Sequence, residues 1–308
     1  MTSLIIDCDP GVDDAIALLL AFAARGELDL LAVTTVAGNI GGRLTERNAR
    51  LIRQIAGREN VAVYAGAETP LSRAPVAATH IHGETGLGSL AVSEPAAPLA
   101  HGHAANAIVE LVMARPAGSV TLAAIGPLTN LALAIRLEPA VAQRLGPVAV
   151  MGGARREGGN ITPSAEFNVF ADPHAAQAVF ASGCAITVLG LDATHQVRTT
   201  PARLEAVRRI DTPAGRTAAE LLTFAQGVGV RLFGDDSPPL HDPCTIAWLL
   251  APELFTTVPA EIEVETNSAL TLGHTAVNLR LKQPTPIRWA TKVDAEGLYA
   301  LLLERLSR

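Results

Sequence analysis

The sequence predicts an α/β fold with an open, mostly parallel central sheet that is flanked by helices on both faces. Short runs of β-branched and aliphatic residues alternate along the chain with longer segments of helical periodicity. Strands joined by helices pair in parallel, and the helices then cover both faces of the sheet. The 308 residues show no linker-like break in composition and no repeat of fixed period. We therefore expect one domain, residues 1–308, with a Rossmann-like core.

The aliphatic runs place six strands, and the helical patterns place most of the remaining elements. The strands are expected at residues 4–6, 30–36, 61–65, 120–125, 148–151 and 186–191. Helices are expected at residues 14–25, 45–56, 104–114, 128–137, 173–181, 217–230, 244–250 and 295–306. The strand-like runs 260–266 and 275–281 have no helix between them, which predicts a hairpin. Ligands of open α/β sheets bind beyond the carboxyl ends of the strands, so the active site is expected there.

The composition excludes several classes of protein. Lys and Arg number 24 against 30 Asp and Glu, and this net charge of -6 gives no attraction for a nucleic-acid backbone. The longest apolar run, residues 15–24, is too short to span a membrane, and no secretion signal precedes the first strand. Three scattered cysteines, Cys8, Cys184 and Cys244, predict neither a disulfide framework nor a metal site. We expect a soluble, cytoplasmic protein without a membrane or nucleic-acid partner.

Four carboxylates follow the first strand within eight residues: Asp7, Asp9, Asp13 and Asp14. Crowded carboxylates repel one another and raise one another's pKa unless a cation or hydrogen-bond donors compensate. An all-oxygen ligand set favours Ca²⁺ or Mg²⁺ over zinc, and Ca²⁺ if carbonyl groups join it. The simpler alternative is that these residues only cap the following helix.

A second alternative is a phosphohydrolase with Asp7 as nucleophile, as in the haloacid dehalogenase superfamily, which the segment resembles in its Asp-x-Asp pattern. Pro10 and Gly11 argue against it, because that superfamily usually has Thr or Val and then Leu at these places. No Lys or Arg lies within residues 7–14 to accompany a phosphate.

Further polar groups stand at the predicted strand ends. Each has a structural alternative: Asn39 as a turn residue, His82 as a solvated loop residue, and Asp242 as a helix cap. A long polar loop with donors, acceptors and one aromatic ring is suited to gripping a vicinal diol. The groups concerned are Asn39, His80, His82, Ile125-Gly126-Pro127, Met151-Gly152-Gly153, Asn160, Glu166-Phe167-Asn168 and His241-Asp242.

In this order, from Asp7 to about Arg280, these segments resemble the inosine/uridine-preferring nucleoside hydrolases. The resemblance implies hydrolysis of the N-glycosidic bond of ribonucleosides to free base and ribose, in purine and pyrimidine salvage. It implies a Ca²⁺ held by the side chains of Asp9, Asp14 and Asp242 and by the carbonyl of Ile125. Asp9 then activates a metal-bound water.

The resemblance also assigns the remaining site residues. The ribose hydroxyls are bound by Asp13, Asn160, Glu166 and Asn168, Asn39 supports the side of the attacking water, and Met151 belongs to the substrate site. His82 and Phe167 face the base, His241 assists its departure, and Asp7 supports the site from behind. Family members are commonly homodimers or homotetramers, so a homo-oligomer is expected.

One departure concerns the base. Residues 221–232, a helix that often contributes tyrosines in relatives, contain none here. The preference for purine or pyrimidine is therefore left open, and so is the alternative of a non-catalytic nucleoside-binding protein.

Overall fold

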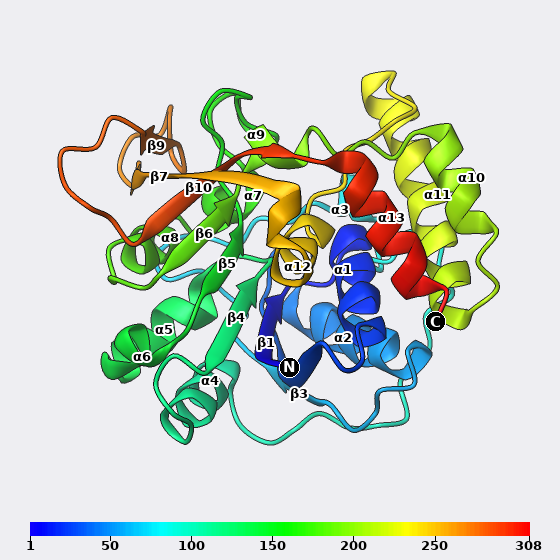
Figure 1. Cartoon of the computed structure of the whole chain (residues 1–308), viewed down its shortest axis with the longest axis horizontal. Coiled ribbons are helices and arrows are strands. Elements are labelled where there is room, and N and C mark those ends of the chain that lie inside the picture. The colour runs from blue at the N-terminus through cyan, green and yellow to red at the C-terminus, as the bar shows by residue number, and fades with distance from the viewer.

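The main sheet has eight strands and confirms the predicted mixed, mostly parallel topology. The computed structural model describes residues 1–308. The strand order is β3-β2-β1-β4-β5-β6-β10-β7, and only β7 pairs antiparallel with its neighbour, β10 (Figure 1). The strands are β1 Thr2–Cys8, β2 Leu28–Thr35, β3 Ala62–Ala65, β4 Val120–Ala124, β5 Val148–Met151, β6 Ile186–Leu189, β7 Phe255–Pro259 and β10 Ile287–Val293.

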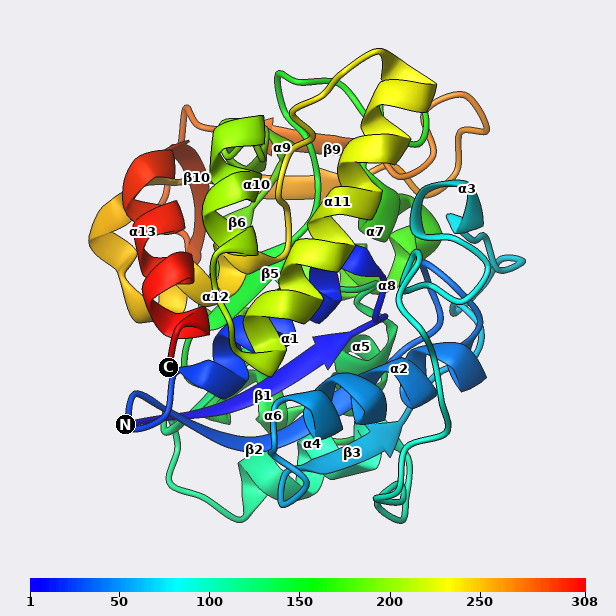
Figure 2. The same cartoon turned by 90° about the vertical axis from the view of Figure 1, so that its right-hand side faces the viewer.

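Helices cover both faces of this sheet, and each face has its own apolar core (Figures 1 and 2). One face carries α1 Val12–Ala23, α2 Gly42–Ile55, α9 Leu191–Thr194, α10 Pro201–Arg208, α11 Pro213–Phe233, α12 Pro243–Leu250 and α13 Ala295–Leu306. The other carries α4 Ala104–Met113, α5 Thr129–Leu137, α6 Ala140–Arg144 and α8 Pro173–Phe180. The short elements α3 Thr79–His82, α7 Phe167–Ala171 and η1 Pro252–Leu254 complete the chain. No helix has the length and apolar character that crossing a bilayer requires.

The six strands predicted from aliphatic runs are confirmed as β1 to β6, with end positions that shift by up to two residues. The predicted hairpin is confirmed as β8 Glu261–Val264 and β9 Thr275–Asn278, but it forms a separate two-stranded sheet. The expectation is incomplete for β7 and β10, which extend the main sheet. Both contain several Thr, Arg or Lys residues, and β7 is an edge strand, so neither shows the aliphatic run by which buried strands are found.

The short helices α3, α6, α7 and α9 were not predicted, and two longer helices also differ from expectation. The helix α10 was not predicted, because its charged sequence buries only Leu204 and Val207. The helix α11 is 21 residues long and begins well before residue 217. Its start is set by Thr212, whose hydroxyl accepts a hydrogen bond from Gly215 N at 2.9 Å, and by Pro213 at the first helical position.

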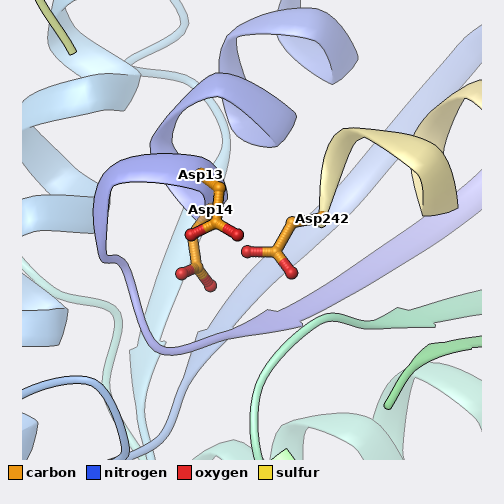
Figure 3. A group of neighbouring side chains, drawn as sticks. All are labelled: Asp13, Asp14 and Asp242. Atoms are coloured by element: carbon orange, nitrogen blue, oxygen red, sulfur yellow. The ribbon is translucent and has the colours of Figure 1, made fainter. Parts of the chain in front are cut away.

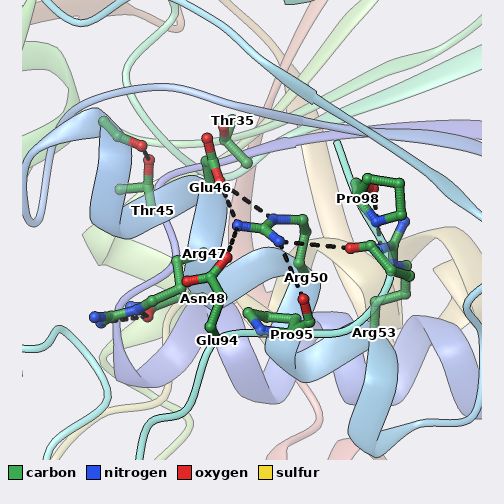
Figure 4. A network of polar contacts seen from close by, with 12 residues as sticks. Thr35, Thr45, Glu46, Arg47, Asn48, Arg50, Arg53, Glu94, Pro95 and Pro98 are labelled. Atoms are coloured by element: carbon green, nitrogen blue, oxygen red, sulfur yellow. Dashed lines mark hydrogen bonds and ion pairs between the residues drawn. The ribbon is translucent and has the colours of Figure 1, made fainter. Parts of the chain in front are cut away.

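The long connection between α3 and α4 is fastened to α2 by buried arginines (Figure 4). Arg50 binds Glu46 at 2.7 Å and Glu94 at 2.6 Å, and it donates to the carbonyls of Pro95 and Ala97. Asn48, on the same helix, donates to Thr85 O at 2.8 Å and to Pro10 O at 3.0 Å. The helix α2 therefore holds the segment after α3, which contains Thr85, and the segment after β1, which contains Pro10, in a fixed relative position.

We expect Arg50→Met to lower the free energy of unfolding by about 1–3 kcal/mol, because it leaves Glu46 and the buried carbonyl of Pro95 without their donor. Urea denaturation measures the change. Arg43→Met, an exposed position of the same helix, is the matched control and should stay within about 0.5 kcal/mol of the parent protein. Equal effects of the two substitutions would contradict the role given to Arg50.

Candidate active site

A cavity of about 450 Å³ opens at the carboxyl ends of the central strands, where the sequence predicts the site. Its walls come from the loops that follow β1, β2, β4, β5 and β6, from α3 and α11, and from the start of α12. The structure brings nearly all predicted site residues into this wall: Asp13, Asn39, His82, Ile125, Met151, Asn160, Glu166, Phe167, Asn168, His241 and Asp242. Asp9 and Asp14 lie behind the wall and are completely buried.

Three carboxylates converge at one end of the cavity (Figure 3). Asp13 and Asp14 are in the first turn of α1, and Asp242 immediately precedes α12. One oxygen from each lies within 4.8 Å of the others, a spacing at which one metal ion can be shared. Asp242 makes no capping hydrogen bond to α12, so the capping alternative does not describe it.

Asp9 stands beside this group with one free oxygen. Its Oδ2 accepts a hydrogen bond from Asn39 N at 2.7 Å, whereas its buried Oδ1 has no hydrogen-bond partner. Glycines make the close packing around it possible: a Cβ on Gly126 would lie 2.5 Å from Asp9 Oδ1, and one on Gly38 would lie 2.1 Å from Oδ2. A buried, unpartnered carboxylate oxygen is costly, and next to the three converging carboxylates of the cavity it indicates a ligand.

Asn39 joins the carboxylates to one another. Besides its backbone bond to Asp9, its side-chain Nδ2 donates to Asp14 Oδ2 at 2.9 Å. Asp14 also accepts from the backbone of Asp9 and Gly11, each at 3.0 Å. These donors fix the orientation of Asp9 and Asp14 but leave oxygens of the cluster uncompensated.

The cluster is therefore electrostatically strained. Burial, together with the nearby carboxylate of Asp13, raises the pKa of Asp14 to about 7. Burial and the charge of Asp14 raise the pKa of Asp9 well above its usual range, and burial with the charges of Asp13 and Asp14 does the same for Asp242. A cation would relieve both desolvation and repulsion.

The residues present fit a hard divalent cation. Carboxylate oxygens of Asp14, Asp242 and Asp13 or Asp9 are available, and the unpartnered Oδ1 of Asp9 needs a positive partner. The carbonyl of Ile125 also lines the cavity edge and accepts one hydrogen bond, from Asn168 Nδ2 at 2.9 Å, which leaves its second lone pair free. No nitrogen or sulfur ligand belongs to this group.

A second wall is built around α7. Glu166 caps this helix: its carboxylate accepts from the backbone of Asn168 at 2.9 Å, Val169 at 3.1 Å and Gly153 at 2.9 Å. Burial nevertheless raises the pKa of Glu166. The Asn168 side chain donates to the carbonyls of Ile125 and Met151, at the ends of β4 and β5, and its own oxygen accepts no hydrogen bond from the protein. Asn160 Oδ1 accepts from Phe167 N at 2.9 Å.

The separate hairpin holds this wall in place. Thr275, the first residue of β9, exchanges hydrogen bonds with the backbone of Ala154 at 2.9 and 2.7 Å. His274 forms an isolated bridge with Ala165, just before Glu166. The hairpin thus fixes both ends of the loop that carries Asn160.

Histidines form the opposite side of the cavity. His82 Nδ1 accepts from Val12 N at 3.0 Å, so the ring caps α1 and its Nε2 is the atom free to donate. His241 Nδ1 is 2.8 Å from the hydroxyl of buried Thr194, and the ring lies 5.6 Å from that of His195. Burial lowers the pKa of both His82 and His241, the latter to about 4.

Four residues of this region were not singled out from the sequence: Thr194, His195, Arg198 and Asp235. All except Thr194 line the cavity. Three of them follow β6 closely, so the rule that sites lie beyond strand ends would have found them. Asp235 has no such signal, because it lies in the loop after α11.

Asp7 lies outside the cavity. It is completely buried, and its carboxylate accepts from Thr34 Oγ1 at 2.6 Å and from Asn130 Nδ2 at 2.8 Å. Because a substrate phosphate does not reach this atom, the position argues against Asp7 as a nucleophile.

Comparisons with known proteins agree over the whole chain. A family model described as inosine-uridine preferring nucleoside hydrolase matches residues 4–300. The inosine-uridine preferring nucleoside hydrolase of Leishmania major is 40% identical, covering 99% of this chain and 97% of that protein. The pyrimidine-specific ribonucleoside hydrolase RihA of Photobacterium profundum is 42% identical, covering 99% and 98%. The solved plant nucleoside hydrolase PpNRh1 superposes with a TM-score of 0.92 at 33% identity, over 99% of each chain. The chain therefore belongs to the inosine-uridine preferring nucleoside hydrolase family and is a nucleoside N-ribohydrolase.

Proposed function

We propose that this enzyme is a calcium-dependent ribonucleoside hydrolase in which Asp9 is the general base. The observation that carries the proposal is the unpartnered, buried Oδ1 of Asp9 beside three converging carboxylates at the end of a nucleoside-sized cavity. Asp9, Asp14, Asp242 and the carbonyl of Ile125 would hold the ion. When bound, Ca²⁺ supplies the positive charge that orients the ribose hydroxyls and the attacking water.

The protein groups divide the reaction between them. Asp9 takes a proton from the water while the water oxygen attacks C1′ of the ribose. The C1′–N bond breaks, and its electron pair goes to the base. Asp13, Glu166 and Asn168 hold the ribose hydroxyls, with Asn160 at the outer edge, and Asn39 keeps Asp9 in orientation. The contacts to the ribose thereby stabilise the oxocarbenium-like transition state, which forms on the same sugar.

His241 stands on the side where the base leaves, with His82, Phe167 and Met151 completing the wall. In this proposal the hydroxyl of Thr194, 2.8 Å from Nδ1 of His241, donates to that nitrogen. The ring hydrogen is then on Nε2, the remaining polar atom of the ring. Thr194 is a positioning residue in this account, because it acts through His241.

We expect Thr194→Val to lower kcat about tenfold with little change in KM, because the ring loses the bond that sets its tautomer. Steady-state kinetics on inosine and uridine measure the split. Thr194→Ser keeps the hydroxyl and should restore most of the rate. An unaltered kcat in the Val variant would remove Thr194 from the mechanism.

Base preference and assembly extend this proposal. Relatives of nearly equal identity are named inosine-uridine preferring and pyrimidine-specific, so they do not fix the base. We place the enzyme in nucleoside salvage in the cytoplasm, as a homodimer or homotetramer. Light scattering on the purified protein tests the assembly.

The proposal is tested by incubating the purified enzyme with inosine, uridine, cytidine, adenosine and AMP, and measuring ribose and phosphate separately. We expect ribose from nucleosides and no phosphate from AMP. Phosphate release without ribose would favour the phosphohydrolase alternative. Tight nucleoside binding without either product would favour a non-catalytic binding protein.

A further inference from the structure

Part of the cavity lining is not used by the proposed mechanism, and we call it the lobe. It comprises the α11 residues Leu222, Ala225 and Val228 together with Arg198 and Asp235. Arg198 is the only Lys or Arg residue in the cavity lining. A permanently charged guanidinium in a mostly apolar ligand cavity is a candidate for ligand recognition.

Arg198 is fixed next to His241 by the backbone. Leu240 N, which precedes His241, donates to Val197 O at 2.8 Å, and Thr199 N donates to Pro238 O at 2.8 Å. Arg198 itself forms an antiparallel bridge with Pro239. This short ladder keeps the Arg198 side chain and the His241 ring in one wall of the cavity.

The guanidinium of Arg198 has N–H donors that no protein group accepts from. Its Nη2 forms an ion pair with Asp235 Oδ2, which ties the loop after β6 to the loop after α11. No protein group accepts from its Nε or Nη1, and 38% of the side chain is exposed. Asp235 is held in turn, because its Oδ1 accepts from Ser237 N at 3.0 Å. The ion pair thus orients the guanidinium while free N–H groups remain.

The position of the ribose leaves this lobe to the base. The carboxylates Asp13 and Asp242 mark the end that takes the 2′ and 3′ hydroxyls, and Asn160 and Glu166 stand on the side of α7. The base, attached at C1′, therefore extends past His241 toward α11 and Arg198. This assignment rests on the proposed function.

The nucleobases differ in what they offer a donor. Inosine and guanosine carry a carbonyl oxygen at C6, and uridine carries one at C4. Adenosine and cytidine have an amino group there, whose N–H donors face the guanidinium unfavourably. As the C1′–N bond breaks, its electron pair moves to the base and is shared with this oxygen. A guanidinium N–H then donates a stronger hydrogen bond without losing its proton.

We propose that Arg198 is a base-contacting residue that selects 6-oxopurine and 4-oxopyrimidine ribonucleosides over their amino counterparts and stabilises the departing base. Asp235 positions it. The preference is then set by a residue after β6, in a chain whose α11 lacks the tyrosines noted above.

The test compares kcat/KM for inosine with adenosine, and for uridine with cytidine, in the parent enzyme and in Arg198→Met. We expect the parent to favour the oxo member of each pair, and the Met variant to lose about tenfold on inosine and uridine with little change on adenosine and cytidine. Hydrolysis of p-nitrophenyl β-D-ribofuranoside, whose leaving group needs no such donor, should be unchanged.

Three further variants separate recognition from folding. Arg198→Lys keeps the positive charge but loses the planar set of guanidinium donors. It should retain only part of the preference for oxo nucleosides. Asp235→Asn should weaken the preference less than Arg198→Met. Arg231→Met, an exposed arginine of α11 outside the cavity, should change nothing. Equal losses on all five substrates in Arg198→Met would show a structural clamp and overturn the inference.

The outcomes also separate this inference from the proposed function. A parent enzyme that releases no ribose from any substrate overturns both. A parent enzyme that is active, with oxo and amino nucleosides hydrolysed at ratios that Arg198→Met leaves unchanged, overturns the role of Arg198 alone.

Discussion

Asp9→Asn should lower kcat for ribose release by about 10²–10⁴-fold, the usual contribution of a general base. The amide keeps the shape of Asp9 but cannot take the proton of the attacking water. Nucleoside binding should persist, because the cavity wall formed by Glu166, Asn168 and His241 is unaltered. Steady-state kinetics and equilibrium binding of inosine measure the two effects separately.

Folding does not explain this loss. The substitution removes one charge from a group of buried carboxylates that raise one another's pKa, so the metal-free variant should be at least as stable as the parent protein. Asp7→Asn is the matched control, since Asp7 lies two residues before Asp9 and is equally buried but does not line the cavity. A larger activity loss in the Asp7 variant than in the Asp9 variant would contradict the assignment.

The second large effect is on stability and depends on both pH and Ca²⁺. In the folded, metal-free protein the pKa of Asp14 is raised to about 7 and that of Asp7 to about 6, from 3.8. Between about pH 4 and 7 the folded state therefore binds more protons than the unfolded state. The free energy of unfolding must then fall as pH rises through this window.

Calcium should oppose that fall. An ion that binds only the folded state adds about 3 kcal/mol when present at a hundredfold excess over its Kd. The gain should be larger at pH 7 than at pH 5, because the ligands must be deprotonated to bind. Urea denaturation with EGTA and with Ca²⁺, across this pH range, measures both effects. In EGTA, Asp14→Asn should flatten the pH dependence, and a steeper slope in that variant would argue against the raised pKa.

Much of the fold was predictable, because buried parallel strands consist of runs of aliphatic residues that are recognisable in the sequence. The strands β4, β5 and β6 are buried along their whole length and are mostly aliphatic, which is why runs such as residues 148–151 mark them well. The strands β7 and β10 lie at one edge of the sheet and carry Thr, Arg and Lys. The local sequence pattern does not distinguish such a strand from a loop. Only the pairing of the strand with its neighbour in the folded chain distinguishes it.

The site was predictable where residues stand next to a strand end in the sequence. Asp13 and Asn39, in the loops or first turn after β1 and β2, lie in the cavity wall for this reason. The burial of Asp9 and the capping bonds that occupy Glu166 were not visible, because they depend on backbone groups brought together from several loops. The ion pair of Arg198 with Asp235 joins two loops 37 residues apart, so no sequence spacing indicates it.

The central claim, calcium-dependent hydrolysis of ribonucleosides, is tested most directly by ribose release from inosine and uridine after treatment with EGTA and after return of Ca²⁺. We expect chelation to abolish ribose release and Ca²⁺ to restore it in the parent enzyme but not in Asp242→Ala. Full activity in EGTA, with protein shown by elemental analysis to be free of calcium, would contradict it.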